Sequence, residues 1–386
     1  MSLSSCQQEE SNTKSFTVKN NLNLDRTSET VSIPAAKVAQ LVQEFGAENL
    51  LLRDAATDSL LVIQPIDNDL DGAIDEILFQ TDIKGNAEKE FTITGAKDGA
   101  AQQPESEFTT YSRFVPERTD DYTWENERVA FRTYGPVAQK MVEENTAGGT
   151  LTSGMDAWFK RVPYSIINDW YKKNEAEAGY YHIDHGEGYD PYHVGSSRGI
   201  GGIGVWENDT LYTSKNFTGY TTIAEGPIRT LFELRYAPWQ ANGRTINETK
   251  RISLDMGSNL TRFESALQSS GPVPNYTIGI TLHEKEGDVK ANKQDGWFRY
   301  WEPIDDSFLG TGIVLSPARV YDSKDHRVEA KDHSHLYVIT KPDTDTLTYY
   351  AGFGWEKSGQ FKSQQDWDAY LADFAKRLAS PLEVKF

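Results

Sequence analysis

One sixteen-residue stretch, YYHIDHGEGYDPYHVG at residues 180–195, gathers side chains that can move protons. It holds three histidines, three acids and four tyrosines, although the chain of 386 residues contains only 7 histidines. An imidazole titrates near neutral pH, so it can take or give a proton under working conditions. A neighbouring carboxylate can fix its tautomer, and a phenol can act as the partner acid. The pattern predicts proton-transfer chemistry, and the alternative is a hydrogen-bonded structural cluster at a sheet edge.

The local pattern also predicts how this stretch is held. Residues 180–184 should enter as a strand, and residues 185–192 should follow as a loop on a rigid sheet, where catalytic groups are often found. Because side chains alternate along a strand, His182 and Asp184 should face the same side. His185 should lie on the loop that follows.

A second polar stretch, YTWENERVAFRTYGP at residues 122–136, alternates as a single β-strand would. A planar guanidinium suits a sugar carboxylate or sulfate, and an indole ring can stack on a sugar. The alternative is a solvated face on which the arginines pair with neighbouring acids. One face of this strand would carry Trp124, Asn126, Arg128, Ala130 and Arg132.

A third candidate arginine, Arg198, stands in the glycine-rich run GSSRGIGGIG at residues 195–204. Backbone without side chains can approach a ligand closely. We therefore expect Arg198 to be available to an acidic substrate.

An acidic run, DNDLDGAIDE, resembles the oxygen-rich loops that wrap Ca²⁺. It opens as a calcium loop does, but Leu78 stands where the closing acid should be, so an acidic turn is the alternative. Any ion here would be structural. The side chains that could bind it are Asp67, Asp69, Asp71 and Asp75.

A catalytic metal is not expected, although ligand types for one are present. The group His182, Asp184 and His185 could join the pair formed by His333 and His335, which should share one strand face. The sequence does not show whether these two regions meet. Such pairs in strands often hold no metal.

Composition excludes some classes of partner and enzyme. The formal net charge of −19 disfavours nucleic acid as a partner. The chain lacks the nucleophile elbow of Ser-triad hydrolases, the phosphate-binding P-loop and the dinucleotide fingerprint. An acidic substrate remains compatible, because a few arginines can set the potential of one pocket.

The N-terminus predicts a lipid tether. The run LSSC ending at Cys6, the single cysteine of the chain, resembles the lipobox of bacterial lipoproteins, and the acidic residues behind it resemble a Bacteroidetes surface-export signal. We expect residues 1–15 to be a disordered tether of an outer-membrane or periplasmic lipoprotein whose signal peptide is largely missing. The membrane would be reached only through lipidated Cys6, since no stretch of about 18 apolar residues follows.

Turn-separated short strands predict a mainly β fold. Residues 16–100 should form a small N-terminal β-domain, and residues 97–107 a linker. Residues 108–386 should form a large antiparallel β-sandwich, of the supersandwich type, that carries the catalytic site. A helix near the C-terminus should begin after Ser363, with Asp366 completing its cap.

The stretches DDYTWENERVAFRTYGP and YYHIDHGEGYDPYHVG, with the closing helix DWDAYLADFAKRLASPLEV, carry a resemblance. The chain resembles a domain-of-unknown-function family from Bacteroidetes polysaccharide-utilisation clusters, which includes the ulvan oligosaccharide dehydratase. The similarity runs from about residue 17 to the C-terminus. It implies elimination of water from the non-reducing uronic acid of an acidic oligosaccharide, which gives a 4,5-unsaturated sugar.

That reaction has three requirements: neutralisation of the carboxylate, a base for the C5 proton and an acid for the C4 hydroxyl. No organic cofactor is needed. The sequence offers Arg128 or Arg198 for the first, His182 or His185 for the second, and Tyr181 or Tyr192 for the third. Trp124, Asn126, Arg132 and Asp184 are the candidate substrate-binding residues.

Two other functions stay open on the sequence. Acids are plentiful enough to supply the paired carboxylates of a glycoside hydrolase. A non-catalytic, glycan-binding surface lipoprotein would need exposed aromatic residues but no histidine cluster, so the cluster argues against it.

Overall fold

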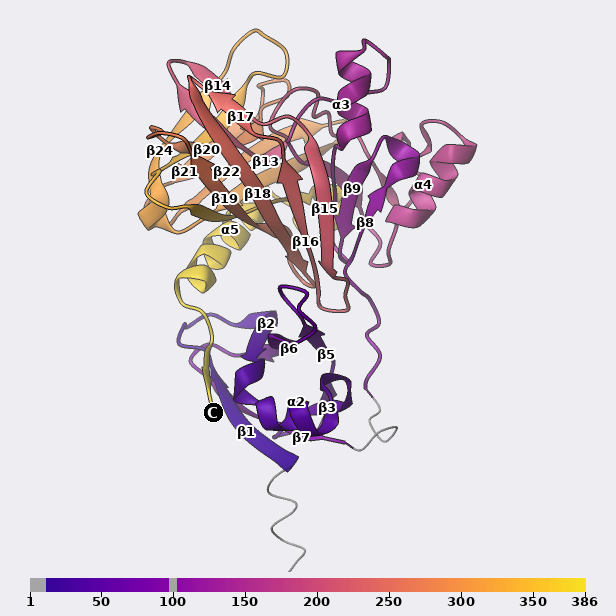
Figure 1. The fold of residues 1–386 in the computed structure, drawn as a ribbon, viewed down its shortest axis with the longest axis vertical. Helices are drawn as coiled ribbons and strands as arrows, with labels where there is room; N and C mark the ends of the chain where they lie inside the picture. Colours follow the sequence, from indigo (N-terminus) through magenta and orange to yellow (C-terminus); the bar gives the residue numbers. More distant parts are fainter. Residues whose placement is uncertain (1–11, 97–102) are drawn as a thin grey trace, which may run out of the picture.

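The computed structural model describes residues 12–96 and 103–386, which form two layered β-domains (Figure 1). Cys6 and residues 1–11 of the predicted tether lie outside the described residues, as does part of the predicted linker. The last residues of the predicted tether are not disordered, because Thr13–Ser15 belong to the first strand. Every paired strand neighbour in the named sheets is antiparallel. The predicted mainly β fold with large antiparallel sheets is therefore confirmed.

The smaller domain consists of two sheets and a short helix around one core. Phe16, Phe79 and Phe91 pack against one another in this core with ring centroids 5.0–5.9 Å apart. The last strand of the chain, β27, pairs with β1, so the C-terminus returns to this domain. In chain order the elements are β1 (Thr13–Lys19), β2 (Arg26–Pro34), α2 (Ala39–Phe45), β3 (Leu50–Asp54), β4 (Leu60–Leu61), β5 (Ile63–Ile66), β6 (Glu76–Ile83), β7 (Glu88–Gly95) and β27 (Glu383–Lys385).

The larger domain is built on two facing sheets. The nine-stranded sheet contains β15 (Phe217–Ala224), β16 (Arg229–Tyr236), β17 (Trp239–Ala241), β18 (Arg244–Asp255), β19 (Leu260–Ser269), β26 (Thr346–Trp355), β23 (Ser307–Val314), β22 (Trp297–Ile304) and β21 (Asp288–Asn292). The five-stranded sheet contains β14 (Thr210–Tyr212), β13 (Ile200–Glu207), β20 (Tyr276–Thr281), β25 (His335–Thr340) and β24 (Val320–His326). Their inner faces share one large hydrophobic core.

A third sheet flanks this sandwich and positions the histidine-rich stretch. It contains β8 (Tyr111–Val115), β9 (Asp121–Glu125), β10 (Ala130–Thr133), β11 (Asp156–Lys160) and β12 (Gly188–Tyr189). Helix α4 (Ile167–Ala176) lies beside this sheet on its outer side, and α3 (Pro136–Glu143) lies beyond the ends of its strands in Figure 1. The buried Glu125 carboxylate accepts hydrogen bonds from the backbone of Ile166 and Ile167, which holds the start of α4 against β9.

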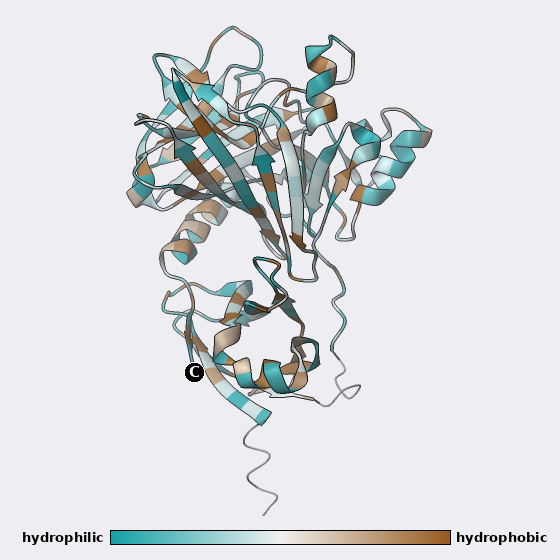
Figure 2. Cartoon of the chain, viewed as in Figure 1, coloured by the Kyte–Doolittle hydropathy of each residue, from teal (hydrophilic) through white to brown (hydrophobic). Residues whose placement is uncertain are grey.

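Helix α5 (Gln364–Ala379) begins as the sequence predicted. The Ser363 hydroxyl accepts from the Asp366 backbone N–H at 3.2 Å, and the Asp366 carboxylate accepts from the Lys362 backbone N–H at 3.0 Å. One face of the helix is apolar and the other polar, as the brown and teal patches in Figure 2 show. Trp367 and Leu371 are fully buried on that apolar face, in one hydrophobic cluster with strand residues of the sandwich.

Two local predictions are wrong. Residues 180–184 do not form a strand: Tyr180–His182 is one turn of 3₁₀ helix, after which the chain loops to β12. Residues 122–136 do not form one strand either. They fold as the hairpin β9–β10 with its turn between Glu125 and Ala130, so the predicted alternation breaks at that turn.

None of the helices in residues 12–96 and 103–386 has the length and apolar character of a transmembrane span.

Replacing Ser363 with alanine should lower the free energy of unfolding by about 1 kcal/mol, because the cap of α5 is lost. Denaturant unfolding of the full chain measures this. Lys362→Ala is the control, since Lys362 contributes only its backbone N–H to the cap and should change stability by less than about 0.5 kcal/mol. Equal stability of Ser363→Ala and the parent protein would contradict the assigned cap.

Candidate functional site

A cavity of about 410 Å³ opens between the flanking third sheet and the loop that follows β12. Its walls combine two arginines, two histidines, one acid and two tyrosines with smaller groups. The residues that line it are Arg118, Arg132, Tyr134, Val142, Gly149, Thr150, Leu151, His182, Asp190, Tyr192, His193, Val194, Gly195 and Ser196. Among the described residues, this is a place where several of the predicted site residues meet.

Arg132 is the charged centre of the cavity floor. It lies on β10 directly opposite Asp156 on β11, so the strand register forms this pair. Its Nε donates to Asp156 Oδ2 at 2.9 Å, and its Nη2 donates to Asp190 Oδ2 at 2.9 Å. Asp121 Oδ2 lies 3.9 Å from its Nη1, and the Tyr134 hydroxyl donates to Asp156 at 3.1 Å. Three buried carboxylates therefore share one buried guanidinium.

This charge arrangement shifts the titration of its members. Burial would lower the pKa of Arg132, but Asp156 and Asp190 outweigh it and hold that pKa well above its ordinary value. Burial and the neighbouring Asp156 raise the pKa of Asp190 well above that of a free aspartate. Burial also raises the pKa of Asp121 to about 6, against the opposing effect of Arg132. The cluster can therefore hold a proton near neutral pH.

His182 stands at the edge of this cluster with its side chain 54% exposed. Its Nδ1 lies 2.7 Å from the backbone carbonyl of Asp190. A carbonyl oxygen can only accept, so Nδ1 carries the proton in this contact. The neutral ring then has its lone pair on Nε2, which is the form that a general base requires.

Arg118 brings a second guanidinium to the cavity. Its Nε donates to the Tyr181 hydroxyl at 3.2 Å, and Nη1 donates to Thr119 at 2.8 Å. Burial would lower the pKa of Arg118, but Asp121 and other neighbours raise it above its ordinary value. Tyr181 lies behind both guanidiniums and also accepts from Arg132 at 3.4 Å, so it does not line the cavity itself.

His193 lines the same cavity from the loop after β12. Its Nε2 lies 3.1 Å from Asp332 Oδ1, and its side chain is 53% exposed. The backbone N–H of Ser196 also donates to Asp332, so one carboxylate fixes both the ring and the loop. Tyr192 completes this wall, but its hydroxyl is buried, and burial raises its pKa well above the ordinary value.

His283 was not a candidate on the sequence, yet it holds this loop. Its Nδ1 lies 2.7 Å from the Glu302 carboxylate and its Nε2 lies 2.9 Å from the His193 carbonyl. Both partners are acceptors, so both ring nitrogens donate and the ring is an imidazolium. Burial would lower the pKa of His283, but Glu302 outweighs it and the pKa is raised. The ring edge also packs against Tyr192, with centroids 4.5 Å apart.

His185 and Asp184 do not reach the cavity, which corrects the prediction that places them beside His182. The His185 ring stacks on Tyr180 at 4.0 Å in an exposed position. Asp184 pairs with Arg161 and accepts from the backbone N–H of Gly186. The cause is the 3₁₀ turn, because its rotation sends neighbouring side chains in different directions.

The hairpin separates Arg132 from the other residues predicted on its strand face. Trp124 is buried in the core, where its indole N–H donates to Thr261, so it is not exposed to stack on a sugar. Asn126 is buried in a turn and donates to the carbonyls of residues 255 and 258. Arg128 pairs with Glu127 outside the cavity. The predicted shared face of Trp124, Asn126, Arg128 and Arg132 is therefore wrong.

Arg198 is also misplaced by the prediction, because it is buried in the sandwich and not offered to a ligand. It donates to the hydroxyls of Ser153 and Thr152 at 3.0 and 2.6 Å. Burial lowers its pKa to about 10. Its backbone N–H donates to His335, whose pKa burial lowers to about 3. His333 is exposed, so these two histidines do not present a pair of ligands.

The acidic run before β6 folds partly as predicted. Oxygens of Asp67, Asp69 and Asp71 lie within 4.8 Å of one another. Asp75 instead accepts from the backbone N–H of Asn68, outside this group. Asp67 accepts from the backbone N–H groups of residues 71 and 72. The calcium site stays a prediction, since an acidic turn explains these contacts as well.

Comparison with known proteins gives one close relative and a likeness of fold. The family model described as "Domain of unknown function (DUF4861)" matches residues 18–384. "Uncharacterized protein P7" of Formosa agariphila is 48% identical over 382 residues, which cover 99% of this chain and 95% of that protein.

Solved structures from Enterococcus faecalis are similar at 10% identity. A protein in the glycosyl hydrolase family 38 has a TM-score of 0.52, with 98% of this chain and 49% of that chain covered. An α-mannosidase has a TM-score of 0.49, with 96% and 46% covered. This chain spans about half the length of these two proteins, and the first likeness shows the fold alone.

The family match extends over nearly all of both β-domains and includes every residue of the cavity. The chain belongs to the DUF4861 family, a family whose function is described as unknown.

Proposed function

We propose that this protein is a carbohydrate-active hydro-lyase that removes water from the non-reducing uronic acid of an acidic, ulvan-type oligosaccharide. The observation that carries the proposal is the position of His182, which lines the same cavity as Arg118 and Arg132 while its Nδ1 is held by the Asp190 carbonyl, so that Nε2 is the nitrogen left to act as a base. A base beside two cations is what proton removal next to a carboxylate requires. The choice of a saccharide as substrate also rests on the fold, which is similar to that of a protein in the glycosyl hydrolase family 38.

The reaction can be written with the residues of the cavity. Arg118 binds the uronate carboxylate, so that negative charge developing at C5 is spread onto a neutralised group. His182 Nε2 takes the C5 proton, and the electron pair of that C–H bond forms the C4–C5 double bond. The C4–O bond breaks, and His193, held by Asp332, gives the leaving hydroxyl a proton to release water.

These assignments revise the roles expected from the sequence. Arg118 replaces Arg128 and Arg198 as the group for the carboxylate, because it lies on the cavity wall and those two arginines do not. His193 replaces Tyr181 and Tyr192 as the acid, because both hydroxyls lie away from the open space. Arg132 acts as a positioning residue: it fixes Asp190, whose carbonyl orients His182.

The arrangement of acids disfavours the glycoside hydrolase alternative. Paired carboxylates should flank the substrate at about 5–9.5 Å. Of the described residues that line the cavity, Asp190 alone is an acid, and Asp156 and Asp121 lie behind it on the same guanidinium. The cavity presents histidines where a hydrolase of this kind would present two opposed acids.

Three further features belong to the proposal. The lipid tether at Cys6 would place the protein in the periplasm or at the outer membrane, where an acidic oligosaccharide is the partner. Nucleic acid is not a proposed partner. The reaction as written uses no catalytic metal or organic cofactor, and the calcium at Asp67, Asp69 and Asp71 would be structural.

Replacing His182 with alanine should lower turnover by ~10²-fold or more, since the base is removed. Saturated uronate oligosaccharides should gain ultraviolet absorbance from the conjugated product with the parent protein and almost none with the variant. His185→Ala is the matched control, because that ring lies outside the cavity, and it should keep the parent rate. Parent activity in His182→Ala would remove this residue from the mechanism, and new reducing ends without absorbance would indicate hydrolysis.

Replacing Arg118 with glutamine should lower kcat/KM for a uronate substrate by about 10–100-fold, the value of one charge-assisted hydrogen bond at the carboxylate. Initial rates by absorbance at several substrate concentrations give this ratio. Arg128→Gln serves as the comparison, because Arg128 pairs with Glu127 elsewhere, and it should leave kcat/KM unchanged. Equal losses in both variants would show that Arg118 has no specific role.

The loop that carries His193 should loosen as pH rises. The pKa of His283 lies above its ordinary 6.5, so its imidazolium contacts are complete below about pH 6.5 and are lost as pH rises through the folded value. The hydrogen-exchange protection factors of residues 190–196, which are corrected for the intrinsic rise of the exchange rate with pH, should therefore fall over that range in the parent protein. In His283→Gln the dependence should be absent, while His326→Gln, on β24, should retain it. An unchanged profile in His283→Gln would refute the assignment.

A further inference from the structure

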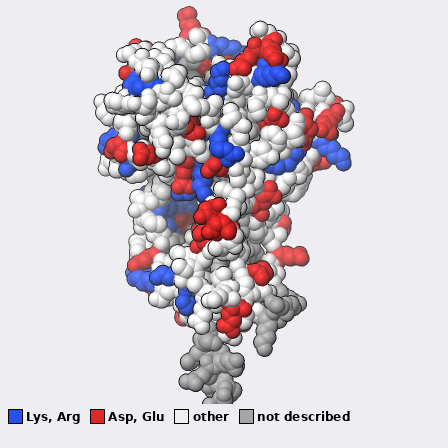
Figure 3. Space-filling view, in the orientation of Figure 1, with Lys and Arg blue, Asp and Glu red and all other residues white. Residues whose placement is uncertain are grey.

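A second cavity lies between the two domains, away from the proposed catalytic site. It has a volume of about 220 Å³, and its walls come from β2 of the small domain, the ends of β16, β18 and β19, the middle of β26, and helix α5. Blue side chains gather in a hollow between the two domains in Figure 3. An adjoining cavity of about 360 Å³ shares Glu29, Thr30, Tyr350, Phe374 and Arg377 with it, so the two form one groove beneath α5.

Charge at this groove differs from that of the whole chain. Three arginines and two acids line the first cavity, in a protein with a net charge of −19. The arginines come from three separate elements: Arg229 from β16, Arg262 from β19 and Arg377 from α5. A small excess of cations inside a concave wall can reverse the local potential.

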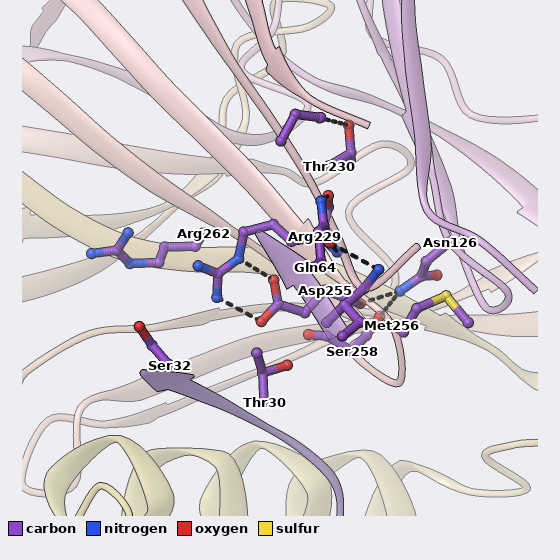
Figure 4. A network of polar contacts seen from close by, with 12 residues as sticks. Thr30, Ser32, Gln64, Asn126, Arg229, Thr230, Asp255, Met256, Ser258 and Arg262 are labelled. Atoms are coloured by element: carbon purple, nitrogen blue, oxygen red, sulfur yellow. Dashed lines mark hydrogen bonds and ion pairs between the residues drawn. The ribbon is translucent and has the colours of Figure 1, made fainter. Parts of the chain in front are cut away.

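The Arg229 guanidinium is already paired with an acid of the protein, and this pair forms the floor of the groove. Its Nε and Nη2 donate to the two oxygens of Asp255 at 2.6 and 2.8 Å, the pair drawn in Figure 4. Gln64 of β5 accepts from the backbone N–H groups of Ile228 and Arg229, which ties the small domain to this edge. Asn126 holds the neighbouring loop, as Figure 4 also shows. The floor is therefore rigid before any ligand binds.

The guanidiniums of Arg262 and Arg377 keep N–H donors for a ligand. Arg262 gives N–H groups to Glu264 on its own strand and to Tyr350, and Arg377 gives one to Glu29. A guanidinium carries five N–H donors, so several on each remain for a ligand. In Figure 4, Arg262 extends away from the Arg229–Asp255 pair, above Thr30 and Ser32 of β2.

Aromatic and hydroxyl groups complete the wall. Tyr350, Tyr370 and Phe374 line the groove, and the rings of Tyr350 and Phe374 lie 4.9 Å apart. Hydroxyls of Ser28 and Thr30 are on the facing strand. Cations, ring faces and hydroxyls together suit a sugar that carries an acid group. The cavity lined by the three arginines has a volume of about 220 Å³, below the ~300–1,000 Å³ of sites for drug-sized ligands, so this part of the groove suits one sugar unit.

We propose that this interdomain groove binds one acidic sugar unit, through its carboxylate or sulfate on Arg262 and Arg377, at a site separate from the catalytic cavity. The choice of a sugar as ligand rests on the proposed function, whereas the anion site rests on the groove alone. Such a site would hold a second part of a long acidic glycan, or a product, while the other cavity acts on a chain end.

Hydrogen–deuterium exchange of the full chain with sodium glucuronate locates the binding. Protection should appear in residues 26–32, 253–262 and 370–378. Glucose should give none, and glucose 6-sulfate should reproduce the pattern, because the site recognises the acid group. In Arg262→Gln, about tenfold more glucuronate should be needed to reach the same protection.

Two variants make the result specific. Arg235→Gln is the matched control: Arg235 also pairs with an acid two residues away, Glu233, but on an exposed face outside the groove, so it should bind as the parent does. Arg118→Gln should also keep the groove protection, even if the proposed catalytic function fails. Protection confined to residues 180–196, protection by glucose equal to that by glucuronate, unchanged protection in Arg262→Gln, or no protection at all would overturn the proposal.

Discussion

One buried guanidinium governs the candidate site. Arg132 has its charge satisfied by Asp156, Asp190 and the more distant Asp121, all of which are buried. Taking these charges out of water costs several kcal/mol per ion, and only close pairing offsets that cost. The network therefore fixes β9, β10, β11 and the loop after β12 relative to one another. The orientation of His182 depends on this, because its partner is the carbonyl of Asp190.

The same loop is fixed from its other side by a second charge, the partly buried imidazolium of His283. His283 donates to Glu302 of β22 and to the carbonyl of His193. The large sandwich therefore holds the His193 side of the cavity, whereas the third sheet holds the His182 side. Two polar networks from different sheets thus meet around one cavity. Because each network holds one side of the loop, a loop without regular structure can present two imidazoles in defined orientations, which proton transfer requires.

The sequence predicted the β-class and the cap of α5, because these depend on local patterns. It also singled out residues 180–195, part of which line the cavity. The prediction from the sequence failed for side chains whose positions are decided by contacts between residues distant in the sequence. Nothing local shows that residues 126–129 turn, so Trp124 and Arg128 were placed on the face of Arg132. A glycine-rich setting suggested exposure for Arg198, yet its ring of hydroxyl partners comes from residues 152 and 153, distant in sequence. His283 lies about 90 residues from the loop it holds, and only the folded chain brings it beside Glu302 of β22 and the carbonyl of His193.

The most direct measurement of the central claim uses a uronate oligosaccharide with deuterium at C5. If His182 removes that hydrogen in a rate-limiting elimination, the parent protein should form the conjugated product more slowly from the deuterated substrate than from the ordinary one, and the released deuteron should enter solvent. Identical rates with the label retained at C5 of the product, or cleavage to new reducing ends without a conjugated product, would contradict proton abstraction at this cavity.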